Sequence, residues 1–316
     1  MSEPLKIDTH IHLYSSREEG QWWKAGYEIW EYGERDGVHF SHDTGTLDET
    51  VAVLRRGGFA HGVVVNLFSA DLFRLQYESM LPPEADGAER AQALAQFDAT
   101  ISERYVAFNR WLMDTLANVP AISGFVAMDP AALSPERNVE HLREMAERGA
   151  RGVKLHPVVQ KFEPDDPRMH PVYQACIELG LTVLSHTGPA KGGEPFAEVP
   201  AFAPMLAEFP GLSVLLAHLG GGKWRDTLAI AQAFPNVAFD LCEIIEWAGA
   251  PSAPTSEELA RLIRDVGPER VVLGSDYPWY EPAHTAELVL SMPVLSQGEK
   301  NAILGENAAR LLHLAV

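Results

Sequence analysis

The residues best suited to chemistry stand almost at the N-terminus, in the run Asp8-Thr9-His10-Ile11-His12. Side chains two positions apart on a β-strand point to the same side, so Asp8, His10 and His12 would face one way. Neutral imidazole is a common ligand of divalent metals, and two such rings side by side would make half of a metal site. Two histidines near a chain end can also be ordinary surface residues, so the interpretation depends on the rest of the chain.

Five further residues that could do chemistry follow strand-like runs elsewhere in the chain. Lys154 and His156 are again two apart, and the others stand at the ends of three later runs: His186, His218 and Asp276. A lone histidine at a strand end is most often a structural residue that is hydrogen bonded. Five strands, counting the first, that deliver His, Lys or Asp to the same end are harder to explain in that way. The set therefore predicts one metal-dependent site where these residues converge.

The elements that would carry these residues alternate regularly along the chain. We expect strands at 5–12, 62–67, 122–128, 152–157, 181–186, 212–218, 237–241 and 270–276, with helices between them. This pattern predicts an α/β fold, a (β/α)8 TIM barrel that occupies residues 1–316 as one domain. The active site of that fold lies at the carboxyl ends of the strands. A doubly wound sheet is the alternative, but it normally has a glycine-rich phosphate loop after its first strand, which His12-Leu13-Tyr14 does not resemble.

Two segments do not fit the alternation and are expected to be insertions. Residues 13–45 after the first strand are expected to form an irregular flap with many aromatic side chains, namely Trp22, Trp23, Tyr27, Trp30, Tyr32 and Phe40. Loops of this length within a compact domain are usually functional, although His39 and His42 in it are expected to be structural or solvent-facing. Residues 70–118 have helical spacing broken at Pro82-Pro83, which predicts an inserted pair of helices that could cap the site.

The composition limits the classes of partner. The 316 residues include 25 Lys and Arg and 44 Asp and Glu, a formal net charge of −19, which argues against binding nucleic acid or an anionic membrane surface. No apolar run approaches the roughly 20 residues that span a bilayer, and residues 1–6 do not resemble a signal peptide. Cys176 and Cys242 lie in apolar surroundings, which predicts buried thiols in a reducing compartment. We expect a cytoplasmic protein, with a homodimer as one plausible state.

Several motifs together resemble the amidohydrolase superfamily. They are Asp8-Thr9-His10-Ile11-His12, Gly152-Val153-Lys154-Leu155-His156-Pro157, His186-Thr187-Gly188, Ala217-His218-Leu219-Gly220-Gly221 and Gly274-Ser275-Asp276-Tyr277-Pro278. They are most similar to the amidohydrolase-2 branch, which includes aminocarboxymuconate semialdehyde decarboxylase and many metal-dependent hydrolases. Residues 304–311 are similar to the C-terminal helix of that branch. The resemblance covers the barrel but neither insertion, and it does not identify a substrate.

The resemblance implies that four residues hold one divalent metal: His10, His12, His186 and Asp276. His218 would stand beside the metal as an acid, a base or a polarising group. Three imidazoles and a carboxylate leave a position open for water or substrate, as in catalytic metal sites, and Asp276 could also accept a proton from water. Zinc is the metal expected first, with manganese, iron, cobalt and nickel as alternatives, because this ligand set suits several metals.

The role of Lys154 has two interpretations. In some members of the superfamily the corresponding lysine is carboxylated and bridges two metals, and His218 would then join as a ligand. The pattern around Lys154 is closer to members with one metal. We therefore expect one metal and an ordinary lysine cation that binds substrate or pairs with a carboxylate. Asp8 is expected to orient a ligand histidine.

Three further residues are expected to contact substrate together with Lys154. His156 would line the site, since it follows Lys154 by two positions on the same strand. Arg225 follows a glycine triplet at an expected helix start, where anions such as a substrate carboxylate can bind. Trp279 lies just beyond the last strand and could wall the pocket.

Two enzymatic functions are compatible with these residues. The first hypothesis is a metal-dependent hydrolase that cleaves an ester, lactone or amide bond of a small metabolite with a metal-activated water. The alternative is a nonoxidative decarboxylase of an unsaturated or aromatic carboxylic acid, with the same metal and His218. The metal ligands do not separate the two. A binding protein with an inactive barrel site is a third hypothesis, which the intact set of histidines and Asp276 argues against.

Overall fold

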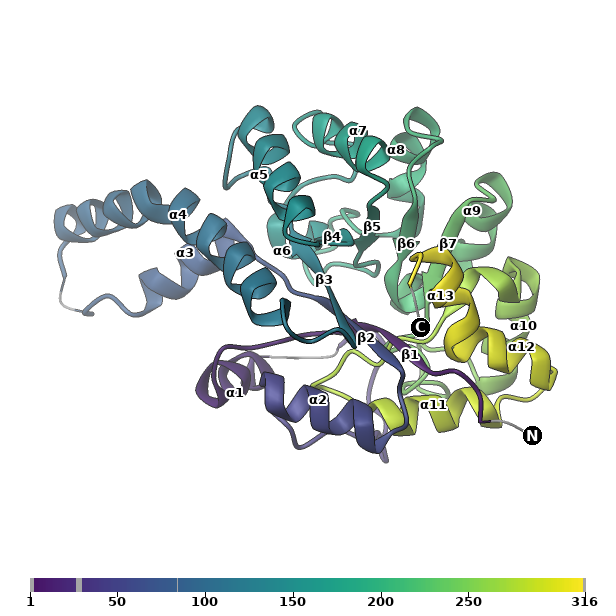
Figure 1. Cartoon of the computed structure of the whole chain (residues 1–316). Coiled ribbons are helices and arrows are strands. Elements are labelled where there is room, and N and C mark those ends of the chain that lie inside the picture. Colours follow the sequence, from purple (N-terminus) through teal and green to yellow (C-terminus); the bar gives the residue numbers. More distant parts are fainter. Residues whose placement is uncertain (1–2, 27–29, 84, 315–316) are drawn as a thin grey trace.

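Eight parallel strands form the centre of the molecule (Figure 1), in a computed structural model that describes residues 3–26, 30–83 and 85–314. The strands are β1 (Ile7–Ile11), β2 (His61–Val65), β3 (Ile122–Ala127), β4 (Gly152–Leu155), β5 (Thr182–Ser185), β6 (Val214–Leu216), β7 (Val237–Asp240) and β8 (Val271–Val272). Each strand pairs in parallel with the next one in the chain. The segment after β8 returns to β1, where Thr9 N donates to Leu273 O at 3.0 Å and Asp276 N donates to His10 O at 2.9 Å. The predicted (β/α)8 barrel is confirmed.

Helices cover the outside of this barrel and join its strands. The α-helices are α1 (Arg17–Ala25), α2 (Leu47–Arg56), α3 (Ala70–Ser79), α4 (Gly87–Leu116), α5 (Pro135–Glu147), α6 (Pro157–Gln160), α7 (His170–Leu179), α8 (Ala203–Glu208), α9 (Thr227–Ala233), α10 (Ser256–Val266), α11 (Pro282–Ser291), α12 (Gln297–Asn301) and α13 (Asn307–Leu311). Shorter helical turns are η1 (Val199–Phe202), η2 (Ala217–Asp226), η3 (Pro268–Arg270) and the π-helical η4 (Ala302–Glu306). None of the helices in the described part of the chain is both long and apolar enough to cross a membrane.

Alternating side chains of the strands build two apolar layers. In β2, Val63 and Val65 pack into the cluster that also contains Ala308 and Leu312, at and just beyond α13. Val64 between them faces the other way, into the larger cluster that joins the barrel to its surrounding helices. All three valines are completely buried, as expected for parallel strands covered on both faces.

The segment after β1 is more regular than the sequence predicted. The expectation of an irregular flap over 13–45 is wrong for Arg17–Ala25, which form α1. The Ser16 side chain accepts a hydrogen bond from Glu19 N at 3.2 Å and so caps this helix. A serine followed by acidic residues is a helix-start signal, which the many aromatic residues obscured. Tyr27 lies outside the described residues.

The insertion after β2 contains the expected pair of helices, α3 and α4. Asp86 caps α4 and forms a capping box with Glu89. Helix α4 is 30 residues long. Its C-terminal part packs against β3 and α5. Its N-terminal part, together with α3, extends away from the barrel (Figure 1). Much of this segment is therefore the normal crossover between β2 and β3, and Leu72 of α3 reaches the barrel mouth.

Two predicted elements are shorter than expected because the chain turns sharply beyond the strands. The strand expected over 270–276 ends at Val272, and Asp276 adopts a left-handed conformation with φ 62°. The helix expected to start just after the glycine triplet begins at Thr227, since residues 217–226 form the irregular turn η2, in which His218 has φ 62°. Both turns redirect a candidate site residue immediately after its strand.

Candidate active site

His10 of β1, His12 just beyond that strand and the acid beyond β8 form one cluster of metal-ligand atoms. Candidate ligand atoms of His10, His12 and Asp276 all lie within 4.8 Å of one another. His12 Nε2 is 3.0 Å from Asp276 Oδ1, and His10 Nε2 is 3.6 Å from the same oxygen. Two imidazole nitrogens and a carboxylate oxygen that converge in this way suit several divalent metals. The donor set present therefore fits a divalent cation.

His10 is held from both ends of its ring. Its Nδ1 lies 2.8 Å from Asp240 Oδ2 at the end of β7, and its Nε2 lies 3.0 Å from Lys154 Nζ. Burial and the charge of Lys154 lower the pKa of His10 to about 4, although Asp240 opposes this shift. The imidazole is therefore neutral at physiological pH, as a metal ligand must be. Asp240 was missed in the sequence, where its only signal is its place at the end of a strand.

His186 and His218 form a second group just beyond the ends of β5 and β6. His186 Nδ1 is 2.9 Å from His218 Nε2, and the ring of His156 stacks on that of His186 with centroids 3.9 Å apart. Burial lowers the pKa values of His156 and His186 well below the ordinary value for histidine. The structure thus places His186 directly against His218, beside the cluster of His10, His12 and Asp276, and it brings all of these residues to one mouth of the barrel.

Lys154 lies between the two groups and is almost completely buried. Only 1% of it is exposed, and desolvation lowers the pKa of its ammonium group, although the charges of Asp276 and Asp240 oppose this shift. Its Nζ points to His10 Nε2, on the cavity side of the ring. A cation in this position can meet a substrate anion without competing with bulk water.

A cavity of about 550 Å³ opens over these residues. Its floor contains the histidines with Lys154 and Asp276, and its wall contains Trp22, Trp23, Trp30 and Trp279. The Trp279 ring meets the His12 ring edge-on, with centroids 5.1 Å apart. The predicted wall position of Trp279 agrees with this geometry, and the cavity combines a polar floor with an aromatic wall, a common composition for sites of small ligands.

Arg225 does not line this cavity. Its side chain is exposed on η2 and its guanidinium lies 4.2 Å from the centre of the Trp224 ring. The expectation that Arg225 contacts substrate assumed a helix start just after the glycine triplet, but residues 217–226 form the irregular turn η2, on which the Arg225 side chain is exposed. His39 also lies outside the cavity, where its ring is tilted by 33° against that of His284 with centroids 4.6 Å apart.

Asp8 holds backbone groups rather than a histidine ring. Its carboxylate accepts hydrogen bonds from His10 N at 3.1 Å and Ser275 N at 3.0 Å, and from the Ser275 hydroxyl. Burial raises the pKa of Asp8 to about 7, although these hydrogen bonds oppose the shift. The expected ring-orienting role of Asp8 is therefore wrong, and Asp240 occupies that position instead. Asp8 ties β1 to the turn that carries Asp276.

Two acids and a lysine at the cavity were not expected from the sequence: Glu31, Glu243 and Lys191. Glu31 accepts a hydrogen bond from Gly222 N at 3.2 Å. A Cβ atom at Gly188 would lie only 2.8 Å from Glu31 Oε2, so glycine there lets this carboxylate approach the loop after His186. Glu243 follows β7, so the rule that active sites lie beyond strand ends could have found it, whereas no local pattern points to Glu31.

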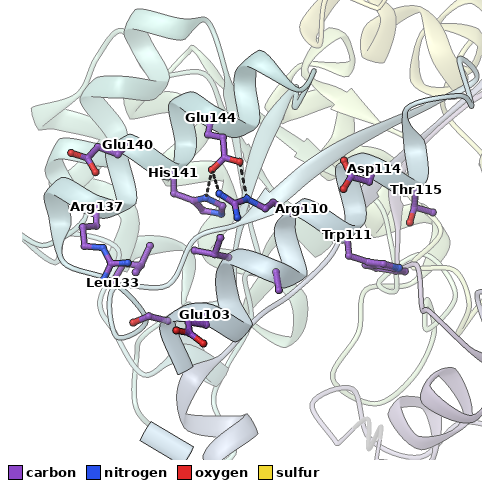
Figure 2. A pocket seen from close by; sticks show the side chains of 13 residues that line it. Glu103, Arg110, Trp111, Asp114, Thr115, Leu133, Arg137, Glu140, His141 and Glu144 are labelled. Carbon is purple, nitrogen blue, oxygen red and sulfur yellow. Dashed lines mark hydrogen bonds and ion pairs between the residues drawn. The ribbon is translucent and has the colours of Figure 1, made fainter. Parts of the chain in front are cut away.

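A larger cavity, of about 1000 Å³, lies between α4 and α5 and is shown in Figure 2. Its charges are mostly paired: Arg110 Nε lies 2.7 Å from Glu144 Oε1, and His141 Nδ1 lies 3.6 Å from Glu144 Oε2. Asn109 occupies the other ring nitrogen of His141 at 3.1 Å. This groove lacks a cluster of metal-ligand atoms, so the barrel mouth is the candidate active site.

Comparison with known proteins agrees with this geometry. The amidohydrolase family matches residues 7–314. The chain belongs to the amidohydrolase family. It is 27% identical over 209 residues to the 2-amino-3-carboxymuconate-6-semialdehyde decarboxylase of Dictyostelium discoideum, a match to 57% of this chain and only 58% of the relative. This amidohydrolase is thus an enzyme of the superfamily that the motifs resemble.

Two solved structures share the fold of this amidohydrolase over nearly its whole length. A 2,6-dihydroxybenzoate decarboxylase in complex with 2,6-dihydroxybenzoate is 16% identical, with a TM-score of 0.65, and the match covers 99% of this chain and 100% of that one. A 5-carboxyvanillate decarboxylase from Novosphingobium aromaticivorans, with bound manganese and a nitrobenzoic acid, is 14% identical, with a TM-score of 0.65 and coverage of 98% and 97%. At these identities the similarity establishes the barrel fold alone.

Proposed function

We propose that this amidohydrolase is a metal-dependent, nonoxidative decarboxylase of a small aromatic or unsaturated carboxylic acid. The observation that carries the proposal is the lining of the cavity: buried Lys154 offers a positive partner for a carboxylate beside the candidate metal ligands, and four tryptophans offer flat surfaces for a planar group. The names of several relatives support the same reaction, since one similar curated protein and the two solved structures described above are decarboxylases.

The metal would be held by His10, His12 and Asp276, with His186 as the fourth candidate ligand. When bound, a divalent cation would supply positive charge that stabilises negative charge developing on the substrate. Its identity is open: zinc is the metal expected from the sequence, whereas manganese is the metal bound in the 5-carboxyvanillate decarboxylase. Burial would raise the pKa of Asp276, but its hydrogen bond with His12 outweighs this and holds the pKa below the ordinary value of an aspartate.

The other residues would bind the acid and move one proton. Lys154 would pair with an oxygen of the substrate, and Trp279 would face the planar ring. The bond between the ring carbon and the carboxylate breaks, the electron pair stays on that carbon, and carbon dioxide leaves. The carbon then takes a proton, which His218 would donate from Nε2 and regain from water.

Hydrolysis was the first hypothesis from the sequence, and the comparisons favour the alternative. A hydrolase must admit and orient a water molecule next to a scissile carbonyl, whereas a decarboxylase needs a proton donor and a charge-stabilising floor. The cavity offers His218 as a candidate proton donor and Lys154 as a candidate charge partner, and these are the groups that a decarboxylase needs. The two reactions differ in their products, and this difference provides the test.

The experiment supplies 2,6-dihydroxybenzoate and 5-carboxyvanillate to enzyme that has been stripped of metal and reloaded with Mn²⁺ or Zn²⁺. We expect carbon dioxide release and, in heavy water, a product with one deuterium at the vacated carbon. His218→Ala should abolish release, whereas His170→Ala, a matched histidine outside the cavity, should not change it. Hydrolysis of a parallel set of esters and lactones, with no carbon dioxide from any acid, would contradict the proposal.

A further inference from the structure

Asp240 is a buried carboxylate that contacts the site without lining the cavity. It is the last residue of β7 and is completely buried. Its two oxygens serve different parts of the site, since Oδ2 faces the ring of His10 and Oδ1 faces the turn that carries His218. A charged group buried this deeply requires hydrogen-bond partners on both oxygens, and Asp240 has them.

The contact with His10 determines which ring nitrogen carries the proton. Asp240 Oδ2 is 2.8 Å from His10 Nδ1, and an ionised carboxylate can only accept, so Nδ1 must be the donor. The other side of the ring agrees: Lys154 Nζ, which can only donate, is 3.0 Å from His10 Nε2, so Nε2 must be the acceptor. His10 is therefore held with its proton on Nδ1 and its lone pair on Nε2, the nitrogen that lies 3.6 Å from Asp276 Oδ1.

The other oxygen of Asp240 holds the backbone of His218. Oδ1 accepts hydrogen bonds from His218 N at 2.8 Å, from Cys242 N at 3.2 Å and from Cys242 Sγ at 2.9 Å. His218 and Leu219 both adopt left-handed conformations, with φ 62° and 45°, which are unfavourable for residues other than glycine. The hydrogen bond from His218 N to Asp240 therefore stabilises the strained backbone at its first residue, His218.

We propose that Asp240 is the positioning residue of this site, which sets the tautomer of His10 and the place of His218 with a single carboxylate. This inference rests on the metal site of the proposed function. Asp240 would act on that site through the candidate metal ligand His10. Because the two oxygens serve two histidines, no neutral side chain of the same shape can replace both contacts. An amide has only one acceptor oxygen, so Asp240→Asn must give up either the ring contact or the backbone contact.

The first test measures Mn²⁺ affinity by calorimetric titration of metal-stripped protein. We expect Asp240→Asn to bind Mn²⁺ about 10- to 100-fold more weakly than wild type, the usual cost of losing such a partner of a ligand histidine. Asp129→Asn is the matched control, because Asp129 is an equally buried acid just after β3. It accepts bonds from Ala70 N at 2.7 Å and Ala131 N at 2.8 Å, and we expect its affinity to stay within about threefold of wild type.

The second test reads the tautomer of His10 directly, in metal-free protein and without substrate. Long-range ¹H–¹⁵N correlation spectra should show a protonated Nδ1 and an unprotonated Nε2 for His10, with its signals assigned by their absence in His10→Ala. A wild-type spectrum with the proton on Nε2 would overturn the proposal, even if Asp240→Asn failed to fold. A folded Asp240→Asn variant that binds Mn²⁺ as wild type does would overturn it as well.

The outcomes of the Mn²⁺ titration and of the tautomer measurement do not depend on which reaction the enzyme catalyses. A wild-type enzyme that releases no carbon dioxide would contradict the proposed decarboxylation but leave both measurements on Asp240 intact. A wild-type protein that binds no Mn²⁺, Zn²⁺ or other divalent cation would contradict the metal site and, with it, the proposed role of Asp240.

Discussion

Single polar contacts decide what the side chains at the barrel mouth can do. The ring of His218 lies with Nδ1 3.2 Å from the carbonyl oxygen of Cys242, which can only accept a hydrogen bond, so Nδ1 is protonated and Nε2 is free to exchange a proton. His186 lies against that nitrogen at 2.9 Å. At the scale of residues, therefore, each histidine presents a defined nitrogen to the cavity, and the neighbouring group determines which one.

Lys154 provides a prediction about metal stoichiometry. Its Nζ already faces His10 within the cavity, and we expect elemental analysis to find about one metal per chain both in wild type and in Lys154→Ala. The kcat/KM for a carboxylic acid should fall about 10- to 150-fold in this variant, because a hydrogen bond between charged groups contributes about 1.5–3 kcal/mol. Lys6→Ala, at a lysine that binds the Gly57 carbonyl far from the site, should change neither quantity.

The alternative for Lys154 has a distinct signature. Close to two metals in wild type, falling in Lys154→Ala, would mean a carboxylated lysine that bridges a metal pair. That result would also return hydrolysis by a metal-activated water to the leading position among the functions considered.

Arg225 provides a second prediction at this scale. Its exposed guanidinium lies on the Trp224 ring, so Arg225→Ala should leave the KM for carboxylic acids within about twofold of wild type. Its free energy of unfolding should fall by no more than about 1 kcal/mol, the usual contribution of an exposed cation–π contact. Steady-state kinetics and urea unfolding measure the two effects. A tenfold rise in KM would restore Arg225 as a substrate ligand.

At the scale of elements, the short helix α1 and the turns beyond the strands shape the cavity. Helix α1 brings Trp22 and Trp23 to the wall, where Trp23 stacks on Tyr14 with ring centroids 6.2 Å apart. The turn after β6 and the turn after β8 aim His218 and Asp276 inward through left-handed residues. The barrel fixes where the strands end, and the irregular turns beyond them determine the directions in which the side chains of His218 and Asp276 point.

Trp22 tests the role of α1. This side chain lines the cavity but is 44% exposed, so Trp22→Ala should fold normally. Its loss should raise the KM for an aromatic acid about 2- to 13-fold, since aromatic contacts contribute about 0.5–1.5 kcal/mol, and should change the KM for an unsaturated aliphatic acid less. Trp111→Ala, in the groove between α4 and α5, is the matched control and should change neither. Equal kinetics for Trp22→Ala and wild type would exclude this helix from substrate selection.

At the scale of the whole molecule, the closed barrel separates a buried interior from a strongly acidic surface. The formal net charge is −19, yet the cavity floor holds Lys154 and several histidines. If a divalent metal binds beside Lys154, the two positive charges would favour a small anion at the mouth of an otherwise acidic protein. The predictions of a cytoplasmic location and a homodimer remain predictions.

The thiols report on the integrity of this interior. Cys176 and Cys242 are completely buried and free, and burial raises the pKa of Cys176 to about 12. Because its pKa is higher in the folded than in the unfolded chain, the thiol stays protonated at pH 8, and stability from this group is lost only above about pH 9. A disulfide reagent at pH 8 should therefore modify neither cysteine of the native protein and both after denaturation. Rapid modification of the native chain would show that the barrel opens readily.

The sequence by itself determined the barrel and most of the histidines at its mouth, together with Lys154 and Asp276, but not Glu31, Glu243 or Asp240. Strand-like runs at regular intervals, together with the rule that parallel strands end at one edge, were enough to gather His10, His12, His186, His218 and Asp276. Lys154 and His156 followed from their spacing of two. These inferences depend on local patterns and on the general geometry of a closed parallel sheet, so no tertiary contact was needed to make them.

Only the tertiary structure determined the directions in which the side chains at the barrel mouth point. The placement of His186 against His218, the outward turn of Arg225 and the link from Asp240 to His10 all depend on groups far apart in the chain. Asp276 and His218 keep left-handed conformations because distant partners, the His10 carbonyl and the Asp240 carboxylate, bind their backbone N–H groups. Such strain has no local signal in the sequence, because the contacts that stabilise it exist only after the barrel has closed.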